Sequence, residues 1–184
     1  MAIGNDLQDR IKRYIDDAIA LEAAGITGLK DMISDATDPI DAALFQEHLA
    51  ETELQKQHLE ARLNALGGHH NALKETMNRI GSAATDLLSA SKDAGDKATR
   101  NLIQAYMMAN LEVATYESLY AAATEVGDTE TAALAKQIQA QEEAAAKKIF
   151  PRISPMAKAC RPPFQRLSAP RPYWRLRTNK SVFC

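Results

Sequence analysis

Glutamates stand in the apolar stripes of the long helical segments that this sequence predicts. Heptad steps put Glu112 between Ala109 and Tyr116, a position that would normally face the core. A glutamate also falls in the stripe of each of the other three long segments, near its midpoint. The complete set is Glu22, Glu51, Glu112 and Glu142. Antiparallel packing would bring all four carboxylates to one level of a bundle.

Four carboxylates at one level of a dry core would repel each other, and each would also lose its hydration. Two divalent ions would neutralise the four charges. Mid-helix carboxylates on facing helices form di-iron and di-manganese sites in bundles of this kind, and oxygen ligands suit both metals. The sequence therefore predicts a site for two iron or manganese ions.

Nitrogen ligands can come from only one of the four segments. A typical site of this kind adds Glu-x-x-His from two helices, but the matching positions here are Leu54 and Ala145. The candidates near Glu51 are instead His48, Gln55 and His58. The alternative is that the glutamates lie at the edges of wide apolar stripes with their carboxylates in water, and that the histidines are merely solvated. Tyr116 is a candidate to hydrogen-bond a ligand carboxylate, or else an ordinary core tyrosine.

Four long segments must position these residues, and apolar residues recur in them at steps of three and four. Thr37-Asp38-Pro39 predicts the start of the second segment, and Gly127-Asp128 predicts a short turn between the last two. A weaker amphipathic pattern at 73–88 predicts a shorter crossover helix. The predicted fold is an all-α, ferritin-like four-helix bundle of two helical hairpins joined by a long crossover. The long helices are expected at 7–33, 39–66, 98–126 and 128–149.

The chain divides by composition near Phe150-Pro151. Residues 151–184 hold eight Lys/Arg, no Asp/Glu and six of the seven prolines, which leaves fourteen basic against twenty-four acidic residues in 1–150. We therefore predict a bundle over 1–150 that ends at Pro151, and a basic, proline-rich, disordered tail over 151–184. The tail is the only candidate for nucleic-acid binding, through its basic charge. The alternative, which we favour, is a disordered extension that binds no nucleic acid.

No apolar run approaches the roughly 20 residues that a membrane helix needs, and no signal-peptide pattern opens the sequence. We expect a cytoplasmic protein without a membrane partner. Both cysteines, Cys160 and Cys184, follow the predicted bundle, so packing alone must stabilise it.

Three segments resemble the YciE/YciF family of bacterial ferritin-like stress proteins. They are Asp17-Ala-Ile-Ala-Leu-Glu22, Phe45-Gln-Glu-His48-Leu-Ala-Glu51-Thr52 and Glu112-Val-Ala-Thr-Tyr116-Glu-Ser-Leu119. The resemblance covers about residues 7–150. It implies a ferritin-like bundle, commonly a homodimer, with a di-metal site whose carboxylates correspond to the four glutamates above. The chain departs from the family at Ala146, where an acidic residue is expected one turn after Glu142.

Two functions of different classes remain open. The first is a di-metal oxidoreductase that acts on oxygen or peroxide during stress. The second is a non-catalytic helical protein that dimerises through an alanine-rich face and binds no metal. The absence of histidines from three of the four segments favours the second, and the coincidence of four mid-helix glutamates favours the first.

Overall fold

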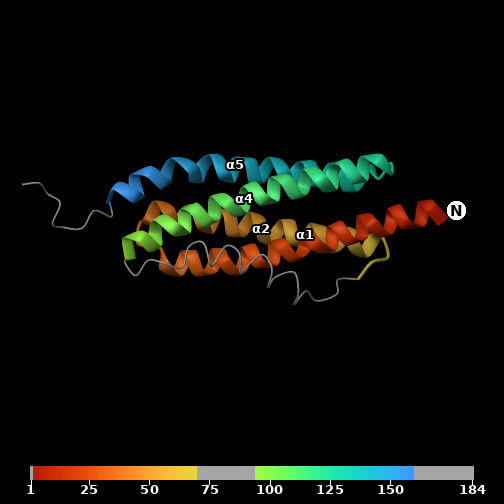
Figure 1. Ribbon diagram of the computed structural model, residues 1–184. Helices are drawn as coiled ribbons and strands as arrows, with labels where there is room; N and C mark the ends of the chain where they lie inside the picture. The colour runs from red at the N-terminus through yellow and green to blue at the C-terminus, as the bar shows by residue number, and fades with distance from the viewer. Residues whose placement is uncertain (1, 70–93, 160–184) are drawn as a thin grey trace, which may run out of the picture.

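A computed structural model describes residues 2–69 and 94–159 as a bundle of four long helices (Figure 1). These are α1 (Ala2–Asp35), α2 (Pro39–Ala65), α4 (Ala94–Glu125) and α5 (Thr129–Ala159). No strand occurs in these two described ranges. The predicted all-α fold is confirmed.

The four helices form two antiparallel hairpins, α1 with α2 and α4 with α5 (Figure 1). Helix α4 begins at the opposite end of the bundle from the end of α2, so these two helices run in the same direction. This is the arrangement that a long crossover produces, in contrast to an up-down bundle. The crossover helix predicted at 73–88 lies outside the described residues.

The helix ends follow the predicted capping residues. The side chain of Asp38 accepts a hydrogen bond of 2.8 Å from the Ile40 amide, with Pro39 in the first turn of α2. Gly127 adopts a φ of 74° and closes α4, a conformation that glycine enters without strain. Asp128 then accepts from the Thr131 amide at 3.0 Å and caps α5. The short turn between these helices is therefore encoded locally.

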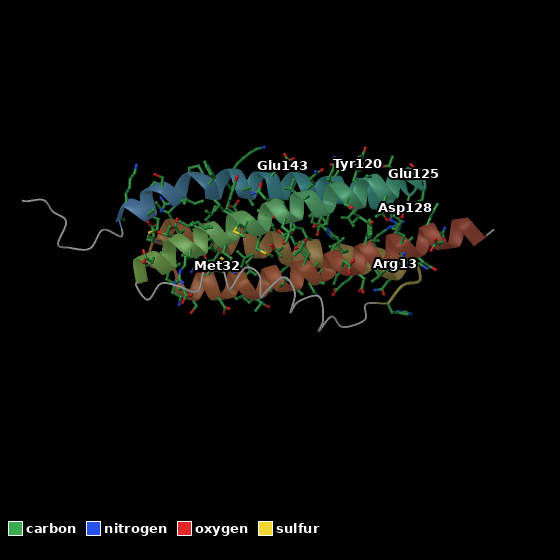
Figure 2. All side chains as sticks on the ribbon, viewed as in Figure 1. Arg13, Met32, Tyr120, Glu125, Asp128 and Glu143 are labelled. Atoms are coloured by element: carbon green, nitrogen blue, oxygen red, sulfur yellow. The ribbon has the colours of Figure 1, made fainter. Side chains whose placement is uncertain are left out.

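The core consists of two apolar clusters separated by a polar layer. Side chains fill the space between the helices from the end near Met32 to the end near Asp128 (Figure 2). One cluster packs around Ile15, Leu59 and Leu119, near the α4–α5 turn. The other cluster consists of Leu29, Met32, Phe45, Leu102, Ala105 and Ile149. The predicted glutamates fall between these two clusters.

The prediction that Pro151 ends the last helix is wrong, because α5 continues to Ala159 with Pro151 and Pro155 inside it. A proline within a helix costs about 3 kcal/mol, and tertiary contacts offset that cost here. Arg152 donates to Asp41 at 2.5 Å and to Asp38 at 2.9 Å, at the start of α2. The partly buried side chains of Ile153 and Met156 extend the second apolar cluster.

The predicted boundary at residue 150 consequently falls inside a helix. Residues 151–159 of the predicted tail belong to α5, and its remaining residues, 160–184, lie outside the described part of the chain.

Candidate metal centre

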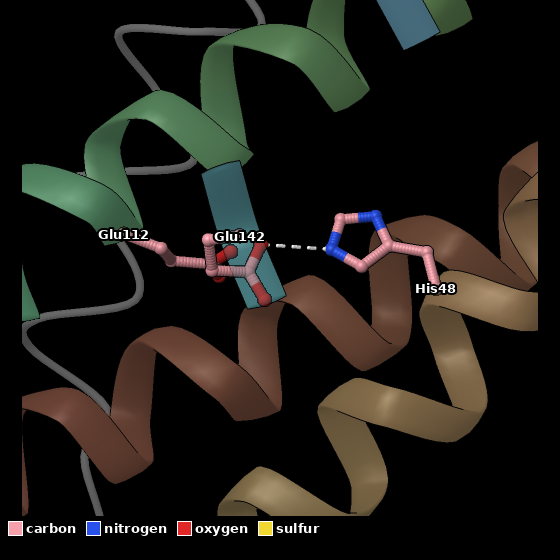
Figure 3. Close-up of side chains that lie close together, drawn as sticks. All are labelled: His48, Glu112 and Glu142. Carbon is pink, nitrogen blue, oxygen red and sulfur yellow. Dashed lines mark hydrogen bonds and ion pairs between the residues drawn. The ribbon is translucent and has the colours of Figure 1, made fainter. Parts of the chain in front are cut away.

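Each of the four helices contributes a buried polar side chain to the layer between the apolar clusters. Glu22 on α1 and Glu142 on α5 are fully buried, Glu112 on α4 is 2% exposed, and His48 on α2 is 4% exposed. Figure 3 shows His48, Glu112 and Glu142 turned toward one another from three different helices. Burial of this kind requires every charge to be paired or neutralised.

Glu142 is the carboxylate that most of the layer contacts. Its Oε2 lies 2.9 Å from Nε2 of His48, and its Oε1 accepts a hydrogen bond of 2.8 Å from the side-chain amide of Gln55. Burial alone would raise the pKa of Glu142. The hydrogen bond and charge of His48 and the hydrogen bonds from Glu112 and Gln55 outweigh burial and lower that pKa. Glu142 is therefore the ionised member of the layer, and His48 must carry its proton on Nε2 to donate to it.

The pKa of Glu112 is shifted in the opposite direction to that of Glu142. Its pKa is raised well above the usual value, first because burial removes water and then because Glu22 and Glu142 repel its negative charge. This shift favours the protonated form of Glu112, which donates a hydrogen bond to Glu142. Donor atoms of His48, Glu112 and Glu142 all lie within 4.8 Å of one another, which is close enough to surround a single ion after small movements.

Glu22 is held by the tyrosine that follows Glu112 by one turn. The hydroxyl of Tyr116 donates to Oε1 of Glu22, and Tyr116 is itself fully buried. Burial raises the pKa of Glu22 to about 8, against the hydrogen bond from Tyr116 and together with repulsion from Glu142. The sequence predicts Tyr116 as a hydrogen-bond partner of a ligand carboxylate, and in the structure that carboxylate belongs to Glu22.

The layer contains buried polar atoms that find no partner among the described residues. They include Oε2 of Glu22, Nδ1 of His48 and Oε1 of Gln55. An unpaired buried polar atom costs about 1–3 kcal/mol. Each of these atoms belongs to a residue of the layer, so the layer has hydrogen-bonding capacity that no described residue uses.

Two of the predicted site residues lie elsewhere. The structure leaves Glu51 half-buried beside His48 at the surface between α2 and α5, in a shallow pocket that Glu47 and Lys148 also line. Burial raises the pKa of Glu51, while Lys148 opposes this increase. His58 is exposed. Heptad steps from Leu44 predict Glu51 and then His58 on the buried stripe of this helix. That prediction is wrong, because the buried face of α2 is displaced from it by one residue.

The buried face of α2 contains polar residues to which the sequence pattern gave too little weight. Thr52 is 1% exposed, and its hydroxyl donates to the carbonyl of His48 at 2.9 Å. Heptad steps counted from Phe45 rather than Leu44 would have found this face: it consists of Phe45, His48, Thr52, Gln55 and Leu59. Leu54, with 54% of its surface accessible, lies outside this face.

No helix in the described part of the chain is both long and apolar enough to cross a membrane.

Solved structures with the same arrangement of helices come from several bacteria. A protein of Xanthomonas campestris is 22% identical, with a TM-score of 0.69 over 83% of this chain and 94% of its own. The E. coli stress protein YciF is 17% identical, with a TM-score of 0.71 over 83% and 97%. Dps from Thermosynechococcus elongatus is 15% identical, with a TM-score of 0.68 over 82% and 94%. These similarities confirm the predicted ferritin-like fold.

A family model described as a domain of unknown function, DUF892, matches residues 6–154. The match extends past Pro151, in agreement with the length of α5. Together with the structural match to YciF, it confirms the resemblance to the YciE/YciF family. The chain belongs to the DUF892 family.

Proposed function

We propose that this chain is a ferritin-like stress protein that holds iron or manganese at the centre of its bundle and acts there on oxygen or peroxide. One observation supports it most: three buried carboxylates and a buried histidine, one from each helix, converge between two apolar clusters. Packing alone does not need such a layer, since apolar residues of similar size would be at least as stable. The neighbours described as a stress protein and as Dps support the same proposal.

The residues present fit a divalent ion. Carboxylate oxygens with one imidazole nitrogen form a donor set that iron and manganese accept. The unpartnered Oε2 of Glu22 and Oε1 of Gln55 are further oxygen donors in the same layer. An ion there would replace the proton that Glu112 shares with Glu142, and the Nε2 proton of His48 would move to Nδ1, so loading would release the proton of Glu112. Bound iron or manganese would supply one-electron chemistry toward oxygen or peroxide.

The layer offers one ion a more complete site than it offers two. Among the described residues, His48, Glu112 and Glu142 bring donor atoms within 4.8 Å of one another. The second ion that we propose would draw on Glu22 and, after a side-chain movement, on the half-buried Glu51. Metal stoichiometry in Glu51 variants separates these two occupancies.

Metal analysis tests the proposal directly. Protein purified without chelator and reconstituted with Fe(II) or Mn(II) should hold between about one and two ions per chain. Glu142→Gln should lose most of this metal because it removes the ionised carboxylate that His48 and Gln55 contact. Glu143→Gln is the matched control, since the neighbouring side chain is 48% exposed. Less than about a tenth of an ion per wild-type chain would contradict the proposal.

The metal-free helical protein is the second candidate, and the hydrogen bonds of the layer favour it. The side chains of Glu112, Glu142, His48 and Gln55 already form a connected network without an ion. In that case glutamine should replace the glutamates with little loss of folding and no change in metal content. We also propose the homodimer expected from the sequence for either candidate, and light scattering of the purified chain measures it.

A further inference from the structure

A small pocket connects the polar layer with the surface between α2 and α5. Its volume is about 10 Å³, and His48 is the residue of the layer that lines it. This is roughly the room that one water molecule needs, so an ion can pass only if a side chain at the rim moves. The walls of this α2–α5 pocket include Leu44, Glu47, His48, Glu51, Lys148 and Ile149.

His48 contacts Glu142 through one ring nitrogen and leaves the other nitrogen unused. Nε2 lies 2.9 Å from Oε2 of Glu142, whereas the buried Nδ1 has no partner among the described residues. Figure 3 shows Nε2 turned toward Glu142 and the second nitrogen on another side of the ring. Because Nε2 carries the proton donated to Glu142, Nδ1 keeps the lone pair that a metal ligand needs. His48 is therefore able to contact an arriving ion before that ion reaches the buried carboxylates.

Two carboxylates of α2 lie between solvent and this histidine. Glu47 is 54% exposed, and Glu51 is half-buried in the wall of the same pocket. The charges of Glu47, His48 and Glu142 all act on Glu51, which places Glu51 between the surface and the layer. Successive carboxylates along a cleft attract cations and raise their local concentration.

The ammonium of Lys148 stands across the α2–α5 pocket. It donates to Oε1 of Glu47 at 2.8 Å and so joins α5 to α2 at the rim. Its charge also acts on Glu51. Lys148 thus neutralises the two carboxylates that an arriving cation would use, and it repels that cation. Its side chain is 45% exposed, and an ion pair in such a position is weak enough to open.

We propose that divalent ions enter the polar layer between α2 and α5, past His48, and that Lys148 limits the rate of entry by holding its charge across this opening. The inference rests on the proposed function, because it assumes that the layer binds metal. It concerns how fast ions arrive and leave, which the number of bound ions at saturation does not determine.

Lys148→Gln and Lys147→Gln form a matched pair on α5. Both remove one positive charge, but Lys147 pairs with Glu143 and lines a separate pocket between α4 and α5. Metal-free protein is mixed with Fe(II) in the absence of oxygen, and a coloured chelator stops loading at successive times. We expect Lys148→Gln to load at least about threefold faster than Lys147→Gln and the wild type, with equal final iron content. Lys148→Arg keeps the charge and should load at the wild-type rate.

Iron release separates a change at the entrance from a change in affinity. Ions leave by the opening through which they enter, so Lys148→Gln should also release iron faster into excess chelator. A variant that only bound iron more tightly would release it more slowly.

Leu44→Trp acts in the opposite direction, because a larger side chain in the wall of the α2–α5 pocket obstructs it. Loading and release should both slow by at least about threefold. Leu54→Trp is the control, since Leu54 is exposed on the same helix and does not line this pocket.

Four outcomes decide the proposal. Equal loading rates in Lys148→Gln and Lys147→Gln would overturn it and leave the proposed function intact. Wild-type rates in folded Leu44→Trp would show that ions enter elsewhere, and would also overturn it. A lower final iron content in folded Lys148→Gln would show that Lys148 supports the metal centre itself rather than entry, with the same consequence. Failure of the wild type to bind iron would instead contradict the proposed function, and this inference with it.

Discussion

The polar layer and the two apolar clusters of this bundle differ in what each contributes. The cluster around Leu59 and Ile15 consists mainly of buried aliphatic side chains, which stabilise the fold because their burial removes apolar surface from water. The layer around Glu142 holds carboxylates with raised pKa values and unpartnered atoms, which weaken the metal-free fold. The bundle therefore separates its main stabilising contacts, which lie toward its ends, from its buried ionisable groups, which lie at its middle.

The largest expected effect on stability comes from the apolar clusters. Leu59→Ala removes a fully buried side chain and should lower the free energy of unfolding by about 2–5 kcal/mol, while metal content stays at the wild-type level. Leu54→Ala is the control on the same helix: Leu54 is 54% exposed, so we expect a loss under about 0.5 kcal/mol. Denaturant titration measures both. Loss of metal from folded Leu59→Ala would contradict the separation of stability from chemistry.

The next effect is a pH dependence that originates in the polar layer. The pKa of Glu22 is about 8 in the fold against an ordinary 4.5, so the folded chain holds a proton that the unfolded chain releases. The stability of the metal-free protein is therefore complete below about pH 4.5 as far as Glu22 is concerned, and falls by up to a few kcal/mol as pH rises through about 8. Glu22→Gln should flatten this decline, whereas Glu125→Gln, at an exposed position, should not.

Metal affinity should show the opposite trend, because ions compete with these protons and bind more tightly as pH rises. Competition titrations with a coloured chelator at several pH values measure this dependence. An affinity independent of pH would show that the protonated carboxyl groups are not ligands.

A smaller effect is expected where α5 continues past Pro151. Arg152→Gln removes the ion pairs to Asp38 and to the buried Asp41, and should cost about 1–2 kcal/mol. Lys147→Gln is the control, because its ion pair with Glu143 involves a side chain that is 77% exposed. Thermal unfolding compares the two variants. Equal melting temperatures would show that the contacts of Arg152 do not stabilise the end of α5.

Heptad counting located the buried faces of three of the four helices and failed on α2, and the end of α5 was also predicted wrongly. The stripes of α1, α4 and α5 contain mainly apolar residues, so heptad counting located their buried faces and with them Glu22, Glu112 and Glu142. On α2 the buried face is polar at its centre, so its apolar residues alone did not distinguish the heptad steps that start at Phe45 from those that start at Leu44. Pro151 could not be recognised as helical, because the ion pairs of Arg152 are tertiary.

The smallest effect concerns Glu51, which separates one bound ion from two. Glu51→Gln should leave stability almost unchanged, because its side chain is half-buried at the surface. If the second ion is bound, this variant should lose about one ion per chain and keep the other at His48, Glu112 and Glu142. His58→Gln, on the exposed side of α2, is the control and should change neither quantity. Equal metal contents in the wild type and Glu51→Gln would exclude Glu51 as a ligand.

The metal content of Glu112→Gln beside the wild type tests the central claim most directly. Glutamine keeps the size of Glu112 and can still donate to Glu142, so the metal-free variant should fold as well as the wild type near pH 7. After parallel reconstitution with Fe(II), elemental analysis should find between about one and two ions in the wild type and less than about a tenth of that amount in the variant. Equal metal content in the two proteins would contradict a metal centre built on this layer.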